Sequence, residues 1–313
     1  MRFSSGVVLV ALSDHGRLYL NSKLACSNAT SFCVHADFLI VTTAEHLAHF
    51  VPLGSAAWKD VVLQGNNTTS TTGIETRTIE RGGKIVTAVA TGIALVLQLP
   101  RGNLETVYPR PLVVSSVCSL LDKYDYLGAF ALCRSHRVDM NLLFDHDPDA
   151  FAANVDAFVE QLNDADKLNL FLSNLRNEYV PRARDVVNRG ILKVSFSHAA
   201  VTARSALKTS TICGLVRGAI EKRPDSRRFL RTVLTSYVCC TPADLPAALA
   251  VVQKIKGEHE EAADALEYLA CLSDPQQLYD GALGLYDLDL VLVVAQQSQK
   301  VWLFFFSLLK PIR

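Results

Sequence analysis

The sequence has no excess of charge of either sign, no long hydrophobic run and almost no low-complexity tract. Lysine and arginine together number 31, and so do aspartate and glutamate. The chain as a whole therefore does not attract the phosphate backbone of nucleic acids, although a local basic surface is compatible with this balance. Neither a GxGxxG motif nor a CxxC pair occurs. These absences remove the common cofactor-binding signatures, so the function has to be sought in surfaces and fold.

Neither end of the sequence has the pattern of a membrane segment. The first twelve residues combine one arginine with a short apolar run but lack a small-residue cleavage site, which indicates a strand and not a signal peptide. Residues 301–309 are intensely apolar, yet far fewer than the roughly 20 residues that span a bilayer. We therefore expect the atypical apolar tail, residues 301–313, to lie in a core or an interface, and we expect no membrane partner.

Eight cysteines are scattered along the chain without pairing logic, and several lie at apolar positions of expected helices. This usage predicts reduced, buried thiols in an intracellular protein. The predicted location is the cytoplasm, with the nucleus as a second compartment. The cysteines are Cys26, Cys33, Cys118, Cys133, Cys213, Cys239, Cys240 and Cys271.

The first hundred residues show short runs of alternating apolar and polar residues separated by turn residues, which is typical of β-strands. Eight strands in this length correspond to about two propeller blades, whereas a propeller closes with about four to eight. We predict a partial β-propeller (about two blades, its C-terminal ones) over residues 1–100; a small sandwich or barrel is the alternative. Open strand edges and the apolar tail together predict poor solubility. The predicted strands cover residues 7–12, 17–20, 31–34, 38–43, 47–51, 74–79, 84–90 and 93–99.

Beyond residue 109 the apolar pattern takes the period of amphipathic helices. Successive helices joined by short caps are typical of a helical-hairpin solenoid, here with irregular tetratricopeptide-like units because no strict repeat of about 34 residues occurs. The predicted fold is mainly α with an N-terminal all-β part. A junction linker at 101–111 leads to an α-solenoid at 112–300. Residues 178–208 are basic and ambiguous.

Individual helices are predicted from apolar residues at helical spacing and from residues that cap helix ends. Residues 124–137 carry Leu127, Phe130, Ala131 and Arg134 at i, i+3, i+4 and i+7, which predicts one buried face. Aspartate followed by proline is a favourable helix start, because aspartate caps a helix and proline suits its first turn. This signature occurs twice, and the first instance opens a predicted helix with one apolar stripe. The starts are Asp147-Pro148 and Asp274-Pro275, and the stripe is Phe151, Val155, Phe158 and Leu162.

Three groups of reactive residues have simpler structural explanations. Residues 81–85 lack the glycine spacing of a phosphate loop and the Ser or Thr after its lysine, so a hairpin turn is favoured. His46 and His49 lie three residues apart on a predicted strand and would point to opposite faces, which disfavours a metal site. Residues 145–147 place a histidine between two aspartates, but adjacent residues do not converge as a triad. No catalytic, cofactor-binding or metal-binding residue is predicted, and the chain is predicted not to be an enzyme.

One basic cluster is the only candidate for contact with nucleic acid. Arg227 and Arg231 are four residues apart and would share a helix face, as suits a phosphate backbone. Glu221 and Asp225 interleave with the cluster, and no aromatic stacking platform accompanies it, so a solvated helix face is the favoured interpretation. The weak candidates are Lys222, Arg223, Arg227, Arg228 and Arg231.

The segment from Gln98 to Arg110, which reads QLPRGNLETVYPR, resembles the propeller-to-solenoid junction of the Elongator complex subunit 1 family. Residues 129–142, 154–159 and 278–287 continue the resemblance, which covers nearly all of residues 18–299. The junction segment is the most specific part of this similarity, and residues 301–313 depart from the family pattern.

This resemblance implies a non-catalytic scaffold subunit that supports modification of the wobble uridine of tRNA. In the family the chemistry belongs to a separate radical-SAM acetyltransferase subunit. The implied partners are the other Elongator subunits, with tRNA as an indirect partner and no cofactor. Dimerisation is implied through a region beyond the matched residues. A vesicle-coat or trafficking scaffold is the alternative function, because such proteins share the propeller-plus-solenoid plan and fold alone does not separate the two.

Overall fold

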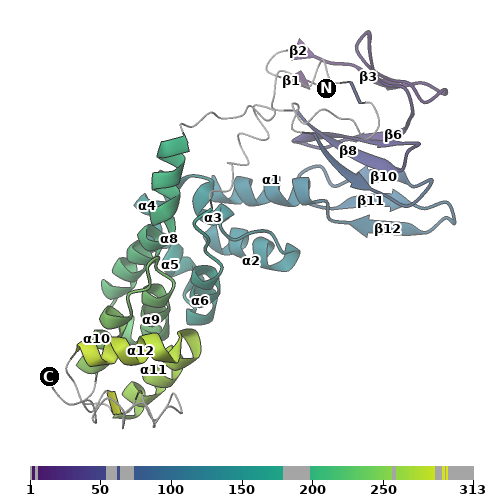
Figure 1. Ribbon diagram of the computed structural model, residues 1–313. Helices are drawn as coiled ribbons and strands as arrows, with labels where there is room; N and C mark the ends of the chain where they lie inside the picture. The colour runs from purple at the N-terminus through teal and green to yellow at the C-terminus, as the bar shows by residue number, and fades with distance from the viewer. Residues whose placement is uncertain are drawn as a thin grey trace. The chain divides into compact units, whose positions relative to one another are not determined.

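The computed structural model describes residues 2–3, 6–53, 62–63, 74–178, 198–255, 259–285, 291–292 and 294. Strands form the N-terminal part and helices the remainder (Figure 1), which confirms the predicted fold class. The chain divides into two compact units, of which the first includes everything described up to Asp147 and the second begins at Pro148. The predicted boundary near residue 100 lies inside the first unit, because three helices belong to that unit together with the strands.

The strands of the first unit form antiparallel sheets, and within each sheet every strand pairs with the strand that comes next in the sequence. Among the described residues the strand orders are β1-β2, β3-β4-β5, β6-β7-β8-β9 and β10-β11-β12. This up-and-down order within each sheet is typical of propeller blades. The strands are β1 (Arg2–Phe3), β2 (Gly6–Val7), β3 (Val10–Leu12), β4 (Leu18–Leu20), β5 (Lys23–Cys26), β6 (Ala29–Val34), β7 (Phe38–Thr43), β8 (Leu47–Pro52), β9 (Glu75–Thr78), β10 (Lys84–Ala88), β11 (Leu95–Gln98) and β12 (Leu104–Val107).

The four-stranded sheet has both faces covered. Every residue of β7 and β8 is buried, and alternate residues of a strand point to opposite faces. On one face Leu39 packs in a cluster with Leu18 of β4. On the other face Ile40 packs in a second cluster with Leu95 of β11. The sheet therefore packs between a neighbouring sheet on each side, which is the stacking of successive propeller blades.

All eight predicted strands have a counterpart, but β1, β5 and β12 were not predicted. Strand β12 falls in residues 101–111, the stretch expected to be a linker. Pro100 and Gly102 looked like a boundary, yet they form a hairpin in which the Leu99 N–H donates to the Asn103 carbonyl at 2.8 Å. Gly102 has a φ of +86°, a conformation that favours glycine. The last sheet thus gains its third strand within the predicted linker.

Strand β12 is a sheet edge that carries one exposed apolar side chain. Among the described residues it pairs only with β11, and its Leu104 side chain is 66% exposed. By contrast, β9 at the edge of the four-stranded sheet consists of exposed polar and charged residues. An edge with free backbone groups and apolar side chains invites pairing with another chain.

We expect Leu104→Lys to reduce concentration-dependent self-association, because a lysine at a strand edge opposes edge-to-edge pairing. Sedimentation velocity over a range of concentrations measures the effect. Thr76→Lys, which adds the same charge to the already polar β9 edge, serves as the matched control. If both variants associate as strongly as the natural chain, the β12 edge does not drive the association.

Three helices complete the first unit: α1 (Arg110–Leu121), α2 (Tyr126–His136) and α3 (Leu142–Asp145). Helix α2 packs against α1 and against α3. Its predicted stripe is shifted by one residue, because Leu127 is 41% exposed and the buried face is formed by other residues. Both stripes have the spacing i, i+3, i+4 and i+7 and share Phe130, so periodicity alone does not choose between them. The buried residues of α2 are Tyr126, Ala129, Phe130 and Cys133.

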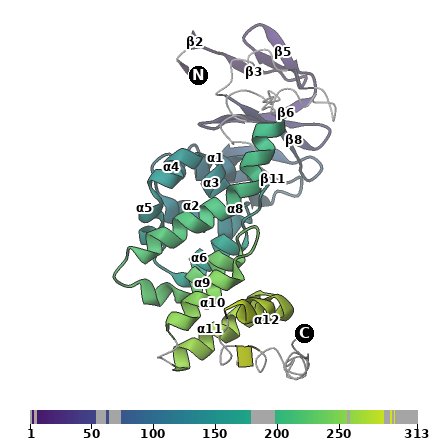
Figure 2. The ribbon, with the colours of Figure 1, turned by 60° about the vertical axis from the view of Figure 1, so that its left-hand side comes forward.

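The second unit is entirely helical in its described part. Helix α5 packs on α8, α6 on α9, α9 on both α10 and α11, and α10 on α12 (Figure 2), so most contacts join near neighbours, as in a solenoid. The elements are α4 (Pro148–Ala153), α5 (Val155–Leu162), α6 (Ala165–Ser173), α8 (His198–Glu221), the 3-10 helix η2 (Ser226–Phe229), α9 (Leu230–Val238), α10 (Leu245–Lys254), α11 (His259–Leu272) and α12 (Pro275–Gly284).

The helix predicted to start at Asp147-Pro148 is interrupted at Asn154, which separates α4 from α5. Its whole predicted stripe is nevertheless buried, from Phe151 to Leu162. The second such start is confirmed, because the Asp274 carboxylate accepts a hydrogen bond from the Gln276 N–H at 3.3 Å where α12 begins. Helix α10 was not predicted, although Asp244 caps it in a similar way.

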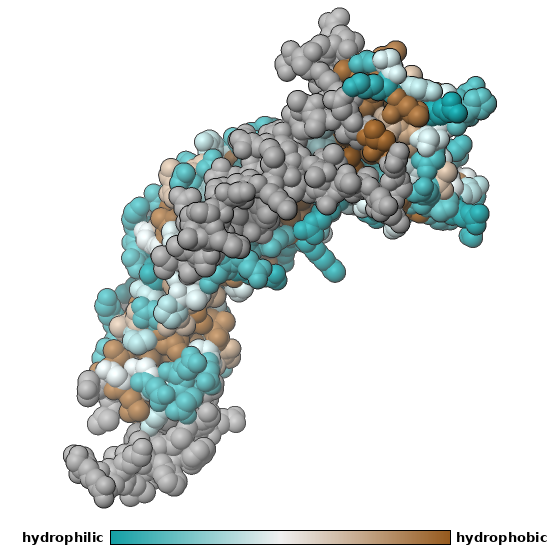
Figure 3. Space-filling model, turned by 45° about the horizontal axis from the view of Figure 1, so that its top comes forward, coloured by the Kyte–Doolittle hydropathy of each residue, from teal (hydrophilic) through white to brown (hydrophobic). Residues whose placement is uncertain are grey.

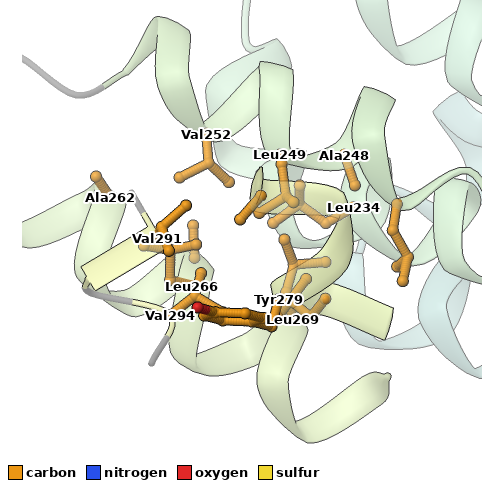
Figure 4. Close-up of a cluster of buried hydrophobic side chains, with 14 residues drawn as sticks. Leu234, Ala248, Leu249, Val252, Ala262, Leu266, Leu269, Tyr279, Val291 and Val294 are labelled. Atoms are coloured by element: carbon orange, nitrogen blue, oxygen red, sulfur yellow. The ribbon is translucent and has the colours of Figure 1, made fainter. Parts of the chain in front are cut away.

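Two hydrophobic centres hold the second unit together. The first is an aromatic cluster in which the Phe158 ring lies 5.0 Å from the Phe151 ring and 5.0 Å from the Phe171 ring. The second joins the last helices, where side chains of α9, α10, α11 and α12 converge (Figure 4), including Leu249 and Leu269, both fully buried.

No helix in the described part of the chain is long and apolar enough to cross a bilayer. On the face shown in Figure 3, hydrophilic residues are interspersed with hydrophobic ones over the described helices. The apolar tail, residues 301–313, lies outside the described residues, as does most of the ambiguous stretch at 178–208.

Candidate functional site: a basic surface and the sheet-to-helix junction

The predicted basic cluster surrounds the short connection between α8 and α9. Lys222 and Arg223 follow the end of α8, while Arg227 and Arg228 lie on the 3-10 helix η2 and Arg231 lies in the first turn of α9. The structure therefore brings the five candidates together on one turn of the chain. All but Arg223 are exposed.

Acidic partners are seen for Lys222 and Arg223. The Arg223 guanidinium donates to both carboxylate oxygens of Asp225, at 2.9 and 3.0 Å. This hydrogen bonding lowers the pKa of Asp225 below its ordinary value and raises that of Arg223. The Lys222 ammonium lies 3.5 Å from the Asp156 carboxylate, with both groups exposed. Because Asp156 belongs to α5, far away in the sequence, this pairing could not be predicted from the local pattern.

Aromatic rings lie beside the cluster but are not open for base stacking. Arg223 and Arg228 lie over the Phe229 ring, at 5.3 and 5.7 Å from its centroid, and Phe229 is fully buried. Arg231 lies 5.6 Å from the ring centroid of Tyr268, whose hydroxyl forms a hydrogen bond of 2.7 Å with the Thr235 hydroxyl. These contacts order the arginines on the surface. Chemically the arrangement suits phosphate oxygens better than bases.

The histidines considered above as possible metal-binding or catalytic residues do not form a common site among the described residues. No group of three or more His, Cys, Asp or Glu side chains within the described ranges could hold a metal ion. His46 occupies the turn between β7 and β8, whereas His49 is buried within β8. The His146 Nε2 atom lies 2.9 Å from an Asp122 carboxylate oxygen, which ties α3 to the end of α1. The histidine thus has a structural partner.

The glycine-containing stretch at 81–83 forms a turn but not the predicted hairpin. The Gly83 N–H donates to the Glu80 carbonyl at 2.9 Å, and Gly82 has a φ of +77°. The strands on either side, β9 and β10, belong to different sheets. The turn therefore carries the chain from one blade to the next, a connection that local turn residues do not distinguish from a hairpin.

His49 gives the first unit a predicted dependence on pH. Burial lowers the pKa of this histidine, and the nearby Glu45 charge opposes the shift only in part. Between the unfolded and folded pKa values the unfolded chain binds more protons, so stability is complete above about pH 6.5 and declines as the pH falls below it. We expect the melting temperature to fall from about pH 7.5 to about pH 5.5, and to fall less in His49→Leu. His15→Gln, at an exposed histidine, is the control, and its melting temperature should fall as much as that of the natural chain. An equal fall in the natural chain and in both variants would contradict the assignment of this pH dependence to His49.

All eight cysteines are free thiols. Cys26, Cys118, Cys133 and Cys213 are buried, but Cys271 is exposed, so the expectation of buried thiols holds for only some of them. Burial raises the pKa of Cys133 to about 12, which makes this thiol unreactive at neutral pH.

At the junction between sheets and helices, the first helix shares a hydrophobic core with the last two sheets. Helix α1 begins after Pro109, and its Leu112 is buried in the same cluster as Phe38 of β7 and Leu97 of β11. The Ser115 hydroxyl of α1 also donates to the Asp37 carboxylate, which precedes β7. Figure 1 shows α1 leaving the end of β12 beside the last sheet. The first helix is therefore fixed to the last blades by both apolar and polar contacts.

Blade-like sheets, a helix fixed to them, and a stack of helices define a propeller-plus-solenoid protein. This is a class whose members present surfaces to other proteins.

The chain belongs to the Elongator complex protein 1 family. A family model described as "ELP1 alpha-solenoid" matches residues 110–309, and one described as "ELP1 N-terminal second beta-propeller" matches residues 2–86. These matches confirm the resemblance of the propeller part and of the solenoid.

Relatives from distant organisms match over almost the whole chain. Elongator complex protein 1 of Schizosaccharomyces pombe is 37% identical over 294 residues, which cover 94% of this chain and 23% of the relative. The protein of the same name from Mus musculus is 37% identical over 300 residues, covering 93% and 22%. The chain thus spans about a quarter of the length of the curated relatives that it matches. Nothing in these comparisons supports the vesicle-coat alternative.

Proposed function

We propose that this chain is a non-catalytic scaffold segment of an Elongator complex and supports modification of the wobble uridine of tRNA. The family match over nearly the whole chain is the observation that carries this proposal. The fixed junction adds a mechanism. Because α1 shares the core of the last blades, a partner bound to the sheets is held in a constant orientation relative to the start of the helices.

In this proposal the chain contributes geometry, and the chemistry belongs to a separate radical-SAM acetyltransferase subunit. The chain needs no cofactor of its own, and it works in the cytoplasm, with the nucleus as a second compartment.

An affinity capture tests the proposal. The tagged chain should recover the radical-SAM acetyltransferase subunit from cells, detected by mass spectrometry with quantification against an untagged control. Leu112→Asp places a carboxylate in the cluster shared by α1 and the sheets, and it should lower the recovery severalfold while Leu127→Asp, on the exposed side of α2, should not. Failure to recover any other Elongator subunit, from cells where the chain is folded and abundant, would contradict the proposal.

We also propose that the basic surface contacts the backbone of tRNA when the complex holds it. Arg227, Arg228 and Arg231 carry this role, because they are the exposed arginines of the cluster. The contact adds affinity without sequence preference, since arginines without an open stacking surface read phosphates and not bases.

A further inference from the structure

Three thiols meet at one place in the second unit. Cys213 lies within α8, while Cys239 and Cys240 directly follow the end of α9. Hydrogen bonds fix the two segments to each other: the Ser210 hydroxyl donates to the Thr241 carbonyl at 3.0 Å, and the Thr241 N–H donates to the Ser210 hydroxyl oxygen at 3.2 Å. Thr209 adds a bond of 3.1 Å between its hydroxyl and that of Thr241. Residue 213 lies one helical turn beyond 209, so its side chain faces the same segment.

The Cys213 and Cys240 side chains are close enough to interact electrostatically. The Cys240 thiol donates a hydrogen bond to the Ser236 carbonyl at 3.0 Å. Burial raises the pKa of Cys213 well above its usual range, with the neighbouring Cys240 and Cys239 adding to the rise. Cys213 is fully buried, whereas Cys240 is half-buried and accessible from solvent.

We propose that Cys213 and Cys240 form an oxidation site, which a hydroperoxide converts into a disulfide. The two residues differ in the way such a pair requires, because Cys240 is only half-buried whereas Cys213 is fully buried. Residues 239 and 240 lie in a bend after the last residue of α9, so a small backbone adjustment can bring the sulfurs to the bonding distance of about 2.0 Å.

The reaction balances with one equivalent of hydroperoxide. The Cys240 thiolate attacks the peroxide oxygen, the O–O bond breaks, and Cys240 becomes a sulfenic acid while the peroxide leaves as water or an alcohol. The Cys213 sulfur then attacks the sulfenic sulfur, the S–O bond breaks, and hydroxide leaves with the Cys213 proton as water. Two thiols are oxidised, and the peroxide is reduced. A small thiol such as glutathione reverses the reaction by exchange.

Other cysteines do not offer the same arrangement. Cys118 and Cys133 are close enough for their charges to interact, but both are buried, so no oxidant reaches either sulfur. The bond between residues 213 and 240 would tie the middle of α8 to the end of α9, two helices that already pack together. It therefore stiffens the second unit without rearranging it. This inference is independent of any role in an Elongator complex.

Peptide mapping of the natural chain tests the proposal. The reduced protein is treated with a small excess of hydrogen peroxide, free thiols are alkylated, and trypsin is added without reductant. Trypsin releases Cys213 in residues 209–217 and Cys240 in residues 232–254. We expect these two peptides to appear joined, with a mass about 2 Da below their sum, and to separate on addition of dithiothreitol.

Variants identify the sulfur atoms. The joined peptides should persist in Cys239→Ser and disappear in Cys240→Ser, a substitution at a half-buried position whose fold is checked by circular dichroism. Cys213→Ser should leave Cys240 as a sulfenic acid that a dimedone probe traps. Three results would overturn the proposal: a bond confined to Cys239 and Cys240 within one peptide, joined peptides that survive Cys240→Ser, or oxidation of the exposed Cys271 with no bond between residues 213 and 240.

Discussion

Replacing Phe158 with alanine is expected to lower the free energy of unfolding of the second unit by about 3–5 kcal/mol. Phe158 is fully buried and lies 5.0 Å, ring centroid to centroid, from both Phe151 and Phe171. The substitution removes the middle ring of the cluster, so two interactions are lost and a cavity remains between three helices. The loss is large compared with the stability of a typical domain, about 5–15 kcal/mol.

Urea unfolding followed by helical circular dichroism measures this effect. Leu272→Ala is the matched control, because it also truncates an apolar side chain of the second unit but at a position that is 39% exposed. We expect the control to cost less than about 1 kcal/mol. A Phe158→Ala chain as stable as the control would show that the aromatic cluster does not hold these helices together.

The triple variant with alanine at Arg227, Arg228 and Arg231 is expected to bind tRNA about tenfold to a hundredfold more weakly at low salt. Each phosphate contact releases counterions, so the loss of three contacts also flattens the dependence of log Kd on log salt concentration by about two to three. Fluorescence anisotropy with labelled tRNA at several salt concentrations measures both quantities.

The control must remove the same charge elsewhere. Alanine at Arg81, Arg101 and Arg134, exposed residues of the first unit, removes three positive charges without touching the basic surface. Lys222→Ala is a second control, because its ammonium already lies beside Asp156. If the charge-matched triple weakens binding as much as the arginine triple, the binding reflects net charge, and the assignment of this surface fails.

Much of the fold could be predicted from local patterns, because those patterns reflect burial on one or both faces. Strand β7 was predicted as residues 38–43 and has these bounds, since both its faces are covered by apolar neighbours. The stripe from Phe151 to Leu162 was predicted because its four apolar residues repeat at helical spacing. Asp274 was recognised as a cap because aspartate favours the N-cap position and proline suits the first helical turn.

Where the prediction failed, the deciding contacts come from residues far away in the sequence. Strand β12 was missed because Pro100 and Gly102 signal a boundary, whereas pairing with β11 makes them a hairpin. The face of α2 was shifted by one residue because the neighbouring helices, and not its own periodicity, decide which stripe is buried. A turn at 81–83 was expected, but only sheet membership shows that it links two blades.

For the basic surface too, local features could be predicted from the sequence, whereas contacts with distant residues could not. The clustering of the five basic residues is visible in the sequence, because they are near neighbours. Their neutralisation is only partly visible: Asp225 is adjacent, but Asp156 reaches Lys222 from another helix. The proximity of Cys213 and Cys240 had no sequence signal at all, since 26 residues separate them and no CxxC spacing occurs.

A chimera in fission yeast tests the central claim most directly. The matching segment of the Schizosaccharomyces pombe relative is replaced by residues 18–285 of this chain, and carboxymethyl-type modification at carbon 5 of wobble uridine is quantified in purified tRNA by mass spectrometry. The account predicts that the chimera restores most of the modification lost in cells without the relative, and that Leu112→Asp in the chimera abolishes this rescue. A chimera that is made at normal levels but leaves the wobble uridine unmodified would contradict it.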